Sequence, residues 1–126
     1  MEIVNKRQWK INKILHYILR ERFRKKIEFN FPKNVDRWNL INEVINIKNF
    51  SSYLEIGCDN DDAFSKIKLK DKIGVDPHSG GNFRGTSDLF FQQNKKKFDC
   101  IFIDGLHEYD QVNKDILNSI DSLNEN

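Results

Sequence analysis

Acidic residues gather around a single glycine in the stretch YLEIGCDNDDAF, residues 53–64. A short apolar run ends at Gly57, and Asp59 and Asp62 occupy the positions where a dinucleotide-binding turn carries its second and third glycines. Asp76 follows Gly57 by 19 residues, the spacing at which such folds place the acid that binds a ribose diol. The spacing favours a nucleoside ligand, whereas the turn lacks the glycines that let a pyrophosphate approach.

The charge of this turn opposes phosphate. At ~5 Å and an effective dielectric of ~20, each carboxylate would repel each negative charge of a pyrophosphate by roughly 3 kcal/mol. A helix N-terminus offsets only ~1 kcal/mol of that repulsion. NAD, FAD and ATP are therefore disfavoured. S-adenosylmethionine (SAM) has an adenosine ribose and a positive charge and lacks phosphate, so it suits both Asp76 and the acidic turn.

Hydrophobic periodicity predicts that strands and helices alternate around these residues. The expected strands span residues 53–56, 72–75, 82–85 and 98–103. The expected helices span residues 3–27, 36–48 after an Asp36 N-cap, 60–67 after Asp59 or Asn60, 88–91 after Thr86 or Ser87, and the final segment 109–123. The fourth strand is almost continuously apolar, which is typical of a strand that is covered on both faces.

This alternation predicts an α/β fold with a parallel sheet. Right-handed crossovers place the carboxyl ends of all the strands at one edge, where such sheets bind their ligands. The segments expected at this edge are 57–62, 76–78, 86–88 and 104–107.

Charge divides the 126 residues into a basic front and an acidic body. Residues 1–33 carry ten Lys or Arg and three Glu, whereas residues 34–126 carry eleven Lys or Arg and sixteen Asp or Glu. We therefore predict a basic amphipathic helix in residues 1–35 and a ligand-binding domain in residues 36–126. The basic face is open to two interpretations. It binds nucleic acid, an anionic membrane or a partner, or it is the solvated face of a helix that packs on the core or on a second copy. No aromatic platform accompanies the charge, so nucleic acid is disfavoured.

The sequence also bounds the compartment and the class of protein. No segment approaches the ~20 apolar residues of a membrane span, and no signal peptide opens the chain. Cys58 and Cys100 stand beside predicted strands without a CxxC or Cys/His cluster. A cytoplasmic protein with reduced thiols is expected.

Several segments resemble the class I SAM-dependent methyltransferases, most closely the methyltransferase-24 type. The matching segments are YLEIGC, IGVDP, TSDLFF, KFDCIFIDGLHEYDQVNKDI and, before the first strand, RWNLINEVI. The resemblance covers residues 36–121. It implies a Rossmann-like parallel sheet with helices on both faces, here shortened to about four strands in the order 3-2-1-4.

The resemblance also implies roles for residues at the strand ends. The implied cofactor-binding residues are Glu55, Gly57, Cys58, Asp59, Asp76, Pro77, Ser87, Asp88 and Asp104. Glu55, Gly57 and Asp59 would serve the amino-acid end of SAM, Asp76 the ribose, and Ser87 and Asp88 the adenine. Asp104 would face the methyl group and the acceptor, and His107 would act as general base.

Each assignment has a structural alternative. Asp59, Asp61, Asp62 and Asp88 are also the acids that favour the first turn of a helix. Asp76-Pro77 is also a turn signal, Cys58 also suits a small core position, and His107 suits a helix start. In metal-dependent relatives the acid equivalent to Asp104 is a metal ligand, but Asp104 alone cannot hold a divalent ion tightly, so a divalent metal is possible but unsupported and no metal ligands are assigned.

The family's sheet normally has seven strands, whereas this chain supplies four. The fourth strand is then an open apolar edge. Two interpretations stay open: the sequence is a fragment of a longer protein, or the edge pairs with another copy, which predicts a homo-oligomer. The expected activity is methylation of an oxygen on a small molecule or sugar. Two alternatives stay open: a non-catalytic SAM-binding module and a SAM-cleaving enzyme, neither of which needs an acceptor pocket.

Overall fold

The computed structural model describes residues 34–125, within the compact unit that begins at Asn34. The helix predicted over residues 3–27 lies outside the described residues. From its start, the described chain runs α2 (Arg37–Lys48), β1 (Ser52–Ile56), the 3-10 helix η1 (Phe64–Lys66), β2 (Asp71–Asp76), β3 (Phe83–Arg84), α3 (Ser87–Gln93), β4 (Cys100–Ile103) and α4 (Tyr109–Asp121).

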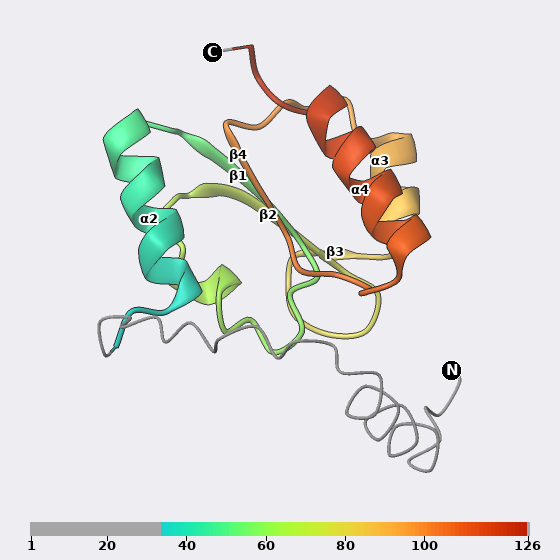
Figure 1. Ribbon diagram of the computed structural model, residues 1–126, viewed down its shortest axis with the longest axis horizontal. Coiled ribbons are helices and arrows are strands. Elements are labelled where there is room, and N and C mark those ends of the chain that lie inside the picture. The colour runs from blue at the N-terminus through green and yellow to red at the C-terminus, as the bar shows by residue number, and fades with distance from the viewer. Residues whose placement is uncertain (1–33, 126) are drawn as a thin grey trace, which may run out of the picture. The chain divides into compact units, whose positions relative to one another are not determined.

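The four strands form one parallel sheet in the order β3-β2-β1-β4, which confirms the predicted α/β Rossmann-like fold. Ile56, the last residue of β1, lies beside Val75 of β2 and Ile103 of β4. The carboxyl ends of the three longer strands therefore meet at one edge, as parallel pairing requires. Helices cover both faces: α2 lies on one side of the sheet, and α3 and α4 lie on the other (Figure 1).

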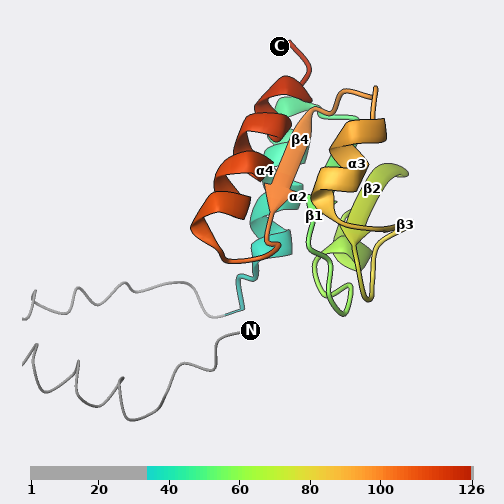
Figure 2. The ribbon, with the colours of Figure 1, turned by 90° about the vertical axis from the view of Figure 1, so that its right-hand side faces the viewer.

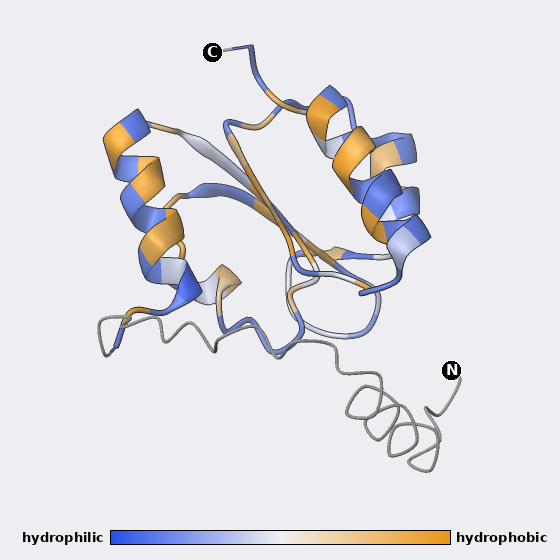
Figure 3. Cartoon of the chain, viewed as in Figure 1, coloured by the Kyte–Doolittle hydropathy of each residue, from blue (hydrophilic) through white to orange (hydrophobic). Residues whose placement is uncertain are grey.

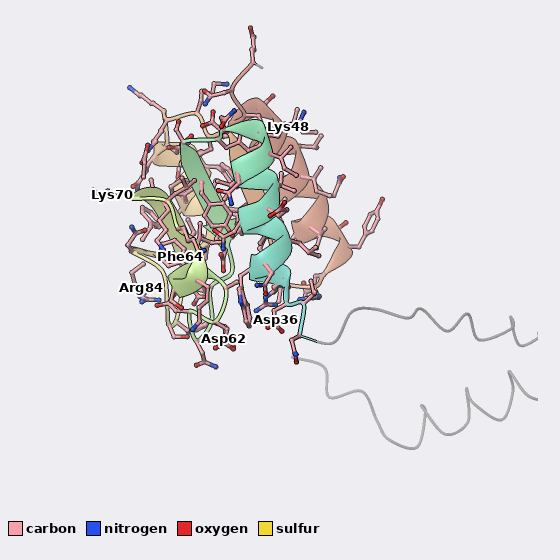
Figure 4. The ribbon with its side chains drawn as sticks, turned by 90° about the vertical axis from the view of Figure 1, so that its left-hand side faces the viewer. Asp36, Lys48, Asp62, Phe64, Lys70 and Arg84 are labelled. Carbon is pink, nitrogen blue, oxygen red and sulfur yellow. The ribbon has the colours of Figure 1, made fainter. Side chains whose placement is uncertain are left out.

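Two apolar clusters hold these layers together because successive residues of β1 point to opposite faces. Tyr53 packs toward α2 in a cluster with Ile45 and Phe64, whereas Leu54 and Ile56 pack toward α3 in a cluster with Phe90 and Phe98. All five β1 residues are buried. Figure 4 views the molecule from the side of α2, with Phe64 of η1 beside that helix.

The helix predicted over residues 60–67 is wrong. The chain makes turns after Gly57 and then the three-residue helix η1. Asp59 and Asp61 have left-handed φ angles of 46° and 64°, which a right-handed helix cannot contain. The Asp61 carboxylate accepts an N–H bond from Gly81 at 2.6 Å, so this acid binds the neighbouring loop and does not begin a helix.

The prediction that the fourth strand is covered on both faces is confirmed only in part: Cys100 and Phe102 pack on the α2-side cluster, and Ile101 and Ile103 on the α3-side cluster. β4 begins at Cys100, and its four residues are only half-buried because β4 is an edge strand that pairs with β1 alone. Phe98 instead forms an isolated bridge with Leu123 beyond α4. Figure 2 shows β4 at one side of the sheet, followed by β1, β2 and β3.

Candidate functional site

A cavity of about 490 Å³ opens at the carboxyl edge of the sheet, on the side of α3 and α4. Its volume lies in the range of small-molecule sites. Five aspartates line it: Asp59, Asp76, Asp88, Asp104 and Asp115. No lysine or arginine is among the described residues of its wall. Ile56, Val75 and Leu106 add apolar surface. Three of the five carboxylates have a cationic partner outside the wall: Asp104 has Arg37, Asp76 has Arg84 at 3.8 Å, and Asp88 has Lys114 at 3.9 Å.

Asp76 ties together the two loops that form one side of the cavity. Its Oδ2 accepts the N–H groups of Cys58 at 3.1 Å and Asp59 at 3.0 Å, and its Oδ1 accepts those of His78 at 2.8 Å and Ser79 at 2.9 Å. Burial alone would raise the pKa of Asp76, but the four N–H bonds outweigh it and hold the pKa below its usual value. A carboxylate has about four lone-pair sites, so a ribose hydroxyl would have to share Asp76 with these N–H groups. Ribose binding by Asp76 stays a prediction.

The turn after β1 offers little to a phosphate. Two of its N–H groups, those of Cys58 and Asp59, are already donated to Asp76. No α-helix begins at the turn, so the positive end of a helix dipole is not aimed at the cavity from this loop. Gly57, with φ of 86°, is required here because a Cβ would collide with the backbone carbonyl of Asp104. This glycine therefore allows the β1 and β4 loops to approach one another.

Asp104 lies at the end of β4 and is shared between the cavity and a side chain of α2. It lines the cavity, and its Oδ2 accepts a hydrogen bond from Arg37 at 2.5 Å. His107, the predicted base, is 84 % exposed, and its Nε2 is 3.6 Å from Asp104 Oδ1, beyond hydrogen-bond range. The structure brings Asp104 into the cavity and leaves His107 outside its wall. The Arg37 contact had no signal in the sequence beyond a basic residue at a helix start.

A polar network on α3 and α4 forms the opposite side of the cavity. The Gln111 side-chain amide lies 3.2 Å from Ser87 Oγ, 3.1 Å from Asp88 Oδ1 and 3.1 Å from Asp115 Oδ1. Ser87 and Asp88 were predicted from the sequence, whereas Gln111 and Asp115 were missed. Their spacing of four residues places both on one face of a helix. The apolar residues of α4 predict its core-facing side from the sequence, so this polar face was overlooked.

Asp115 is the most unusual member of this network. It is only 1 % exposed, and Gln111 is its one hydrogen-bond partner among the described residues. A buried carboxylate normally has an ion-pair partner or several donors. Asp115 lines the cavity, so a ligand there could supply the missing donor or cation.

The structure does not bring the side chains of Glu55 and Cys58 to the cavity. Both lie on the α2 side of the sheet, where the Tyr53 hydroxyl donates to Glu55 Oε2 at 2.6 Å. Burial raises the pKa of Glu55, although the Tyr53 hydrogen bond and Arg37 oppose it. Burial also raises the pKa of the Cys58 thiol to about 12. The remaining predicted cofactor-binding residues, Gly57, Asp59, Asp76, Pro77, Ser87, Asp88 and Asp104, all line the cavity.

Residues 34–125 contain no group of three or more His, Cys, Asp or Glu side chains arranged to hold a metal ion. No described helix has the length and apolar character to cross a bilayer. No family model, curated protein or solved structure matches this chain.

Proposed function

We propose that this chain binds S-adenosylmethionine in the acidic cavity and acts as a SAM-dependent methyltransferase. One observation carries the proposal: five aspartates line a nucleoside-sized cavity at the switch edge of a Rossmann-like sheet, next to a turn whose N–H groups are already used. Such a site repels a pyrophosphate and attracts a cation.

The chemistry of the walls matches the two ends of SAM. Ser87 and Asp88 lie at the start of α3, where they can accept from an adenine amine, and Ile56 and Val75 offer apolar surface to its ring. Asp59 and Asp115 have no ion-pair partner among residues 34–125, so they are the carboxylates available to a sulfonium or ammonium group. When bound, SAM would supply an electrophilic methyl group.

Methyl transfer needs an aligned acceptor and the removal of one proton. Asp104 lines the cavity, and His107, which lies outside the wall with its Nε2 3.6 Å from Asp104 Oδ1, is the candidate base for a hydroxyl on a small molecule or sugar. Arg37 offsets the charge of Asp104, which favours a positioning role for that carboxylate.

A second candidate, a non-catalytic SAM-binding module, is favoured by the same contacts. His107 lies outside the cavity wall, and Asp104 is already paired with Arg37. This candidate shares the ligand and differs in the absence of turnover.

Two measurements test the proposal and separate the candidates. Calorimetric titration with SAM and with its demethylated product should give saturable binding of both at one site per chain. Incubation with SAM and a panel of hydroxyl acceptors should then yield the demethylated product and a methylated acceptor, and His107→Ala should reduce the rate. Binding without product supports the module, and absence of SAM binding contradicts both.

A further inference from the structure

We propose that two copies of this chain pair through their β4 edges, so that the sheet continues across a two-fold axis. In this dimer α2 would pack on the partner's α2, and α4 on the partner's α4. The inference concerns a surface distinct from the cavity and does not depend on the ligand.

The β4 edge is open and unprotected. β4 pairs with β1 on one side, and no described strand pairs with its other side. Natural edge strands are usually guarded by lysine, proline or a bulge. The sequence of β4, CIFI, contains no charged residue and no proline. The opposite edge, β3, has only two residues and includes Arg84, so it offers little for strand pairing.

The exposed apolar flank of α2 lies on the open side of β4. At 100° per residue, Leu40, Val44 and Ile47 share a flank opposite Asn42, whose side chain donates to the Lys66 carbonyl in η1. Arg37, which shares the flank of Leu40 and Val44, reaches Asp104 at the end of β4. Both contacts orient the apolar flank toward the β4 edge.

α4 is oriented in the same way on the other face. Lys114 and Gln111 point toward Asp88 of α3, so the opposite flank of α4, with Ile116 and Ile120, faces the open side of β4. Figure 1 looks onto this side, with β4 in front of β1 and between α2 and α4, and Figure 3 shows apolar segments on both helices.

The exposed area is close to what a dimer needs. The exposed apolar residues on these two flanks and just beyond α4 are Leu40, Val44, Ile47, Ile116, Ile120 and Leu123. Each is 38 % to 68 % exposed. They amount to on the order of 600 Å² per copy if a fully exposed large side chain contributes roughly 150–200 Å². A standard interface buries about 800 Å² per partner, and the half-buried β4 residues would supply part of the remainder.

A second copy is the occupant that matches all three elements at once. A two-fold axis normal to the sheet brings strand edge to strand edge and each apolar flank to its own copy. Residues that lie opposite one another in an antiparallel pair point to the same face of the sheet, and successive residues of one strand point to opposite faces. The axis must therefore pass beside a residue and not between two residues, which places it at Ile101 or Phe102. Because the β3 edge is short and guarded, the assembly closes as a dimer and does not grow into a fibre.

Sedimentation equilibrium of the full chain tests this inference. The wild-type protein should sediment as a dimer, and the double variant Ile47→Lys, Ile120→Lys should be monomeric while keeping its circular dichroism spectrum, since both side chains are exposed in one copy. The control is Leu89→Lys, which changes an exposed leucine of α3. The helix α3 contacts β2 and α4, away from the β4 edge, so this variant should remain dimeric.

Each other outcome overturns the inference. A monomeric wild-type chain means that this face does not pair with a second copy. A dimer that survives the double substitution places the interface elsewhere, for example in residues 1–33. Dissociation of the control to the same extent means that added charge, and not loss of this surface, separates the copies.

Discussion

At the scale of single residues, Asp115 is the most informative carboxylate of the cavity. It is buried, accepts one hydrogen bond from Gln111, and faces a space that a ligand can enter. A cation ~5 Å away would interact with it by roughly 3 kcal/mol at an effective dielectric of ~20, part of which offsets desolvation. Burial of a carboxylate without a charged partner is unfavourable, and a cationic ligand would reduce that free-energy penalty.

Asp115→Asn should weaken SAM binding by at least about tenfold, or ~1.4 kcal/mol, because the amide keeps the shape and removes the charge. Asp121→Asn, at an exposed position of the same helix, is the matched control and should leave the affinity within twofold. Calorimetry measures both. Equal affinities for the two variants would remove Asp115 from the site.

Glu55→Gln should leave the affinity for SAM within about twofold, because Glu55 lies on the α2 side of the sheet. The Tyr53 hydroxyl can still donate to the amide carbonyl. Because burial raises the pKa of Glu55 in the folded state, its ionised form is disfavoured there, so its contribution to stability falls as pH rises above ~4.3, the unfolded value.

The stability difference between Glu55→Gln and the wild type should therefore shift in favour of the variant as pH rises above that value. Thermal melts from pH 4 to 8 measure the shift, and the calorimetric titration measures the affinity. A tenfold loss of SAM affinity would place Glu55 in the site after all.

At the scale of elements, Asp76 connects the end of β2 with the β1 turn and the following loop through four N–H bonds. Asp76→Asn replaces one acceptor oxygen with a donor that faces N–H groups. Charge-assisted bonds of this kind contribute about 1.5–3 kcal/mol each when isolated, so we expect a loss of about 2–4 kcal/mol in the free energy of unfolding at pH 7.

The pKa of Asp76 is lowered by folding, so its contribution is complete above ~3.9, the unfolded value, and is lost as pH falls through the folded value. Denaturant unfolding at pH 7 and pH 3 should show the gap between wild type and Asp76→Asn shrinking in acid. A gap that is the same at both values would show that these N–H bonds do not depend on the carboxylate charge.

The sequence predicted the elements that carry strong periodicity or a strong boundary signal. β1, β2 and α3 begin and end within about two residues of their predicted limits, and Thr86, one of the two predicted caps, caps α3 by accepting from the Leu89 N–H. The order of the strands came from resemblance, and the structure confirms it.

The predictions that were wrong concern features that depend on contacts between residues far apart in the sequence. The helix predicted over 60–67 was lost because Asp61 binds the Gly81 N–H, a contact 20 residues away. In α4, Asp115 and Ser119 are buried, whereas Ile116 and Ile120 are exposed, so its apolar stripe does not face the core of one copy. A pattern of apolar residues identifies a helix, but it cannot say whether the stripe packs on its own sheet or elsewhere.

At the scale of the whole molecule, negative charge is concentrated where the ligand would bind. Residues 34–126 carry eleven Lys or Arg and sixteen Asp or Glu, and five of those acids line one cavity, where Asp59 and Asp115 have no ion-pair partner among residues 34–125. A field of this sign attracts cations and repels phosphates, and the effect weakens as salt screens it. We therefore predict that the cavity selects between two adenosine-containing ligands that differ in charge.

The most direct measurement is a pair of calorimetric titrations of the full chain, with SAM and with NAD, at low and at physiological ionic strength. We expect SAM to bind at one site per chain, with an affinity that falls as salt rises, and NAD to show no saturable binding at millimolar concentration. If NAD binds as tightly as SAM, or if SAM binding strengthens with salt, the cavity does not select its ligand by charge and the proposed function is contradicted.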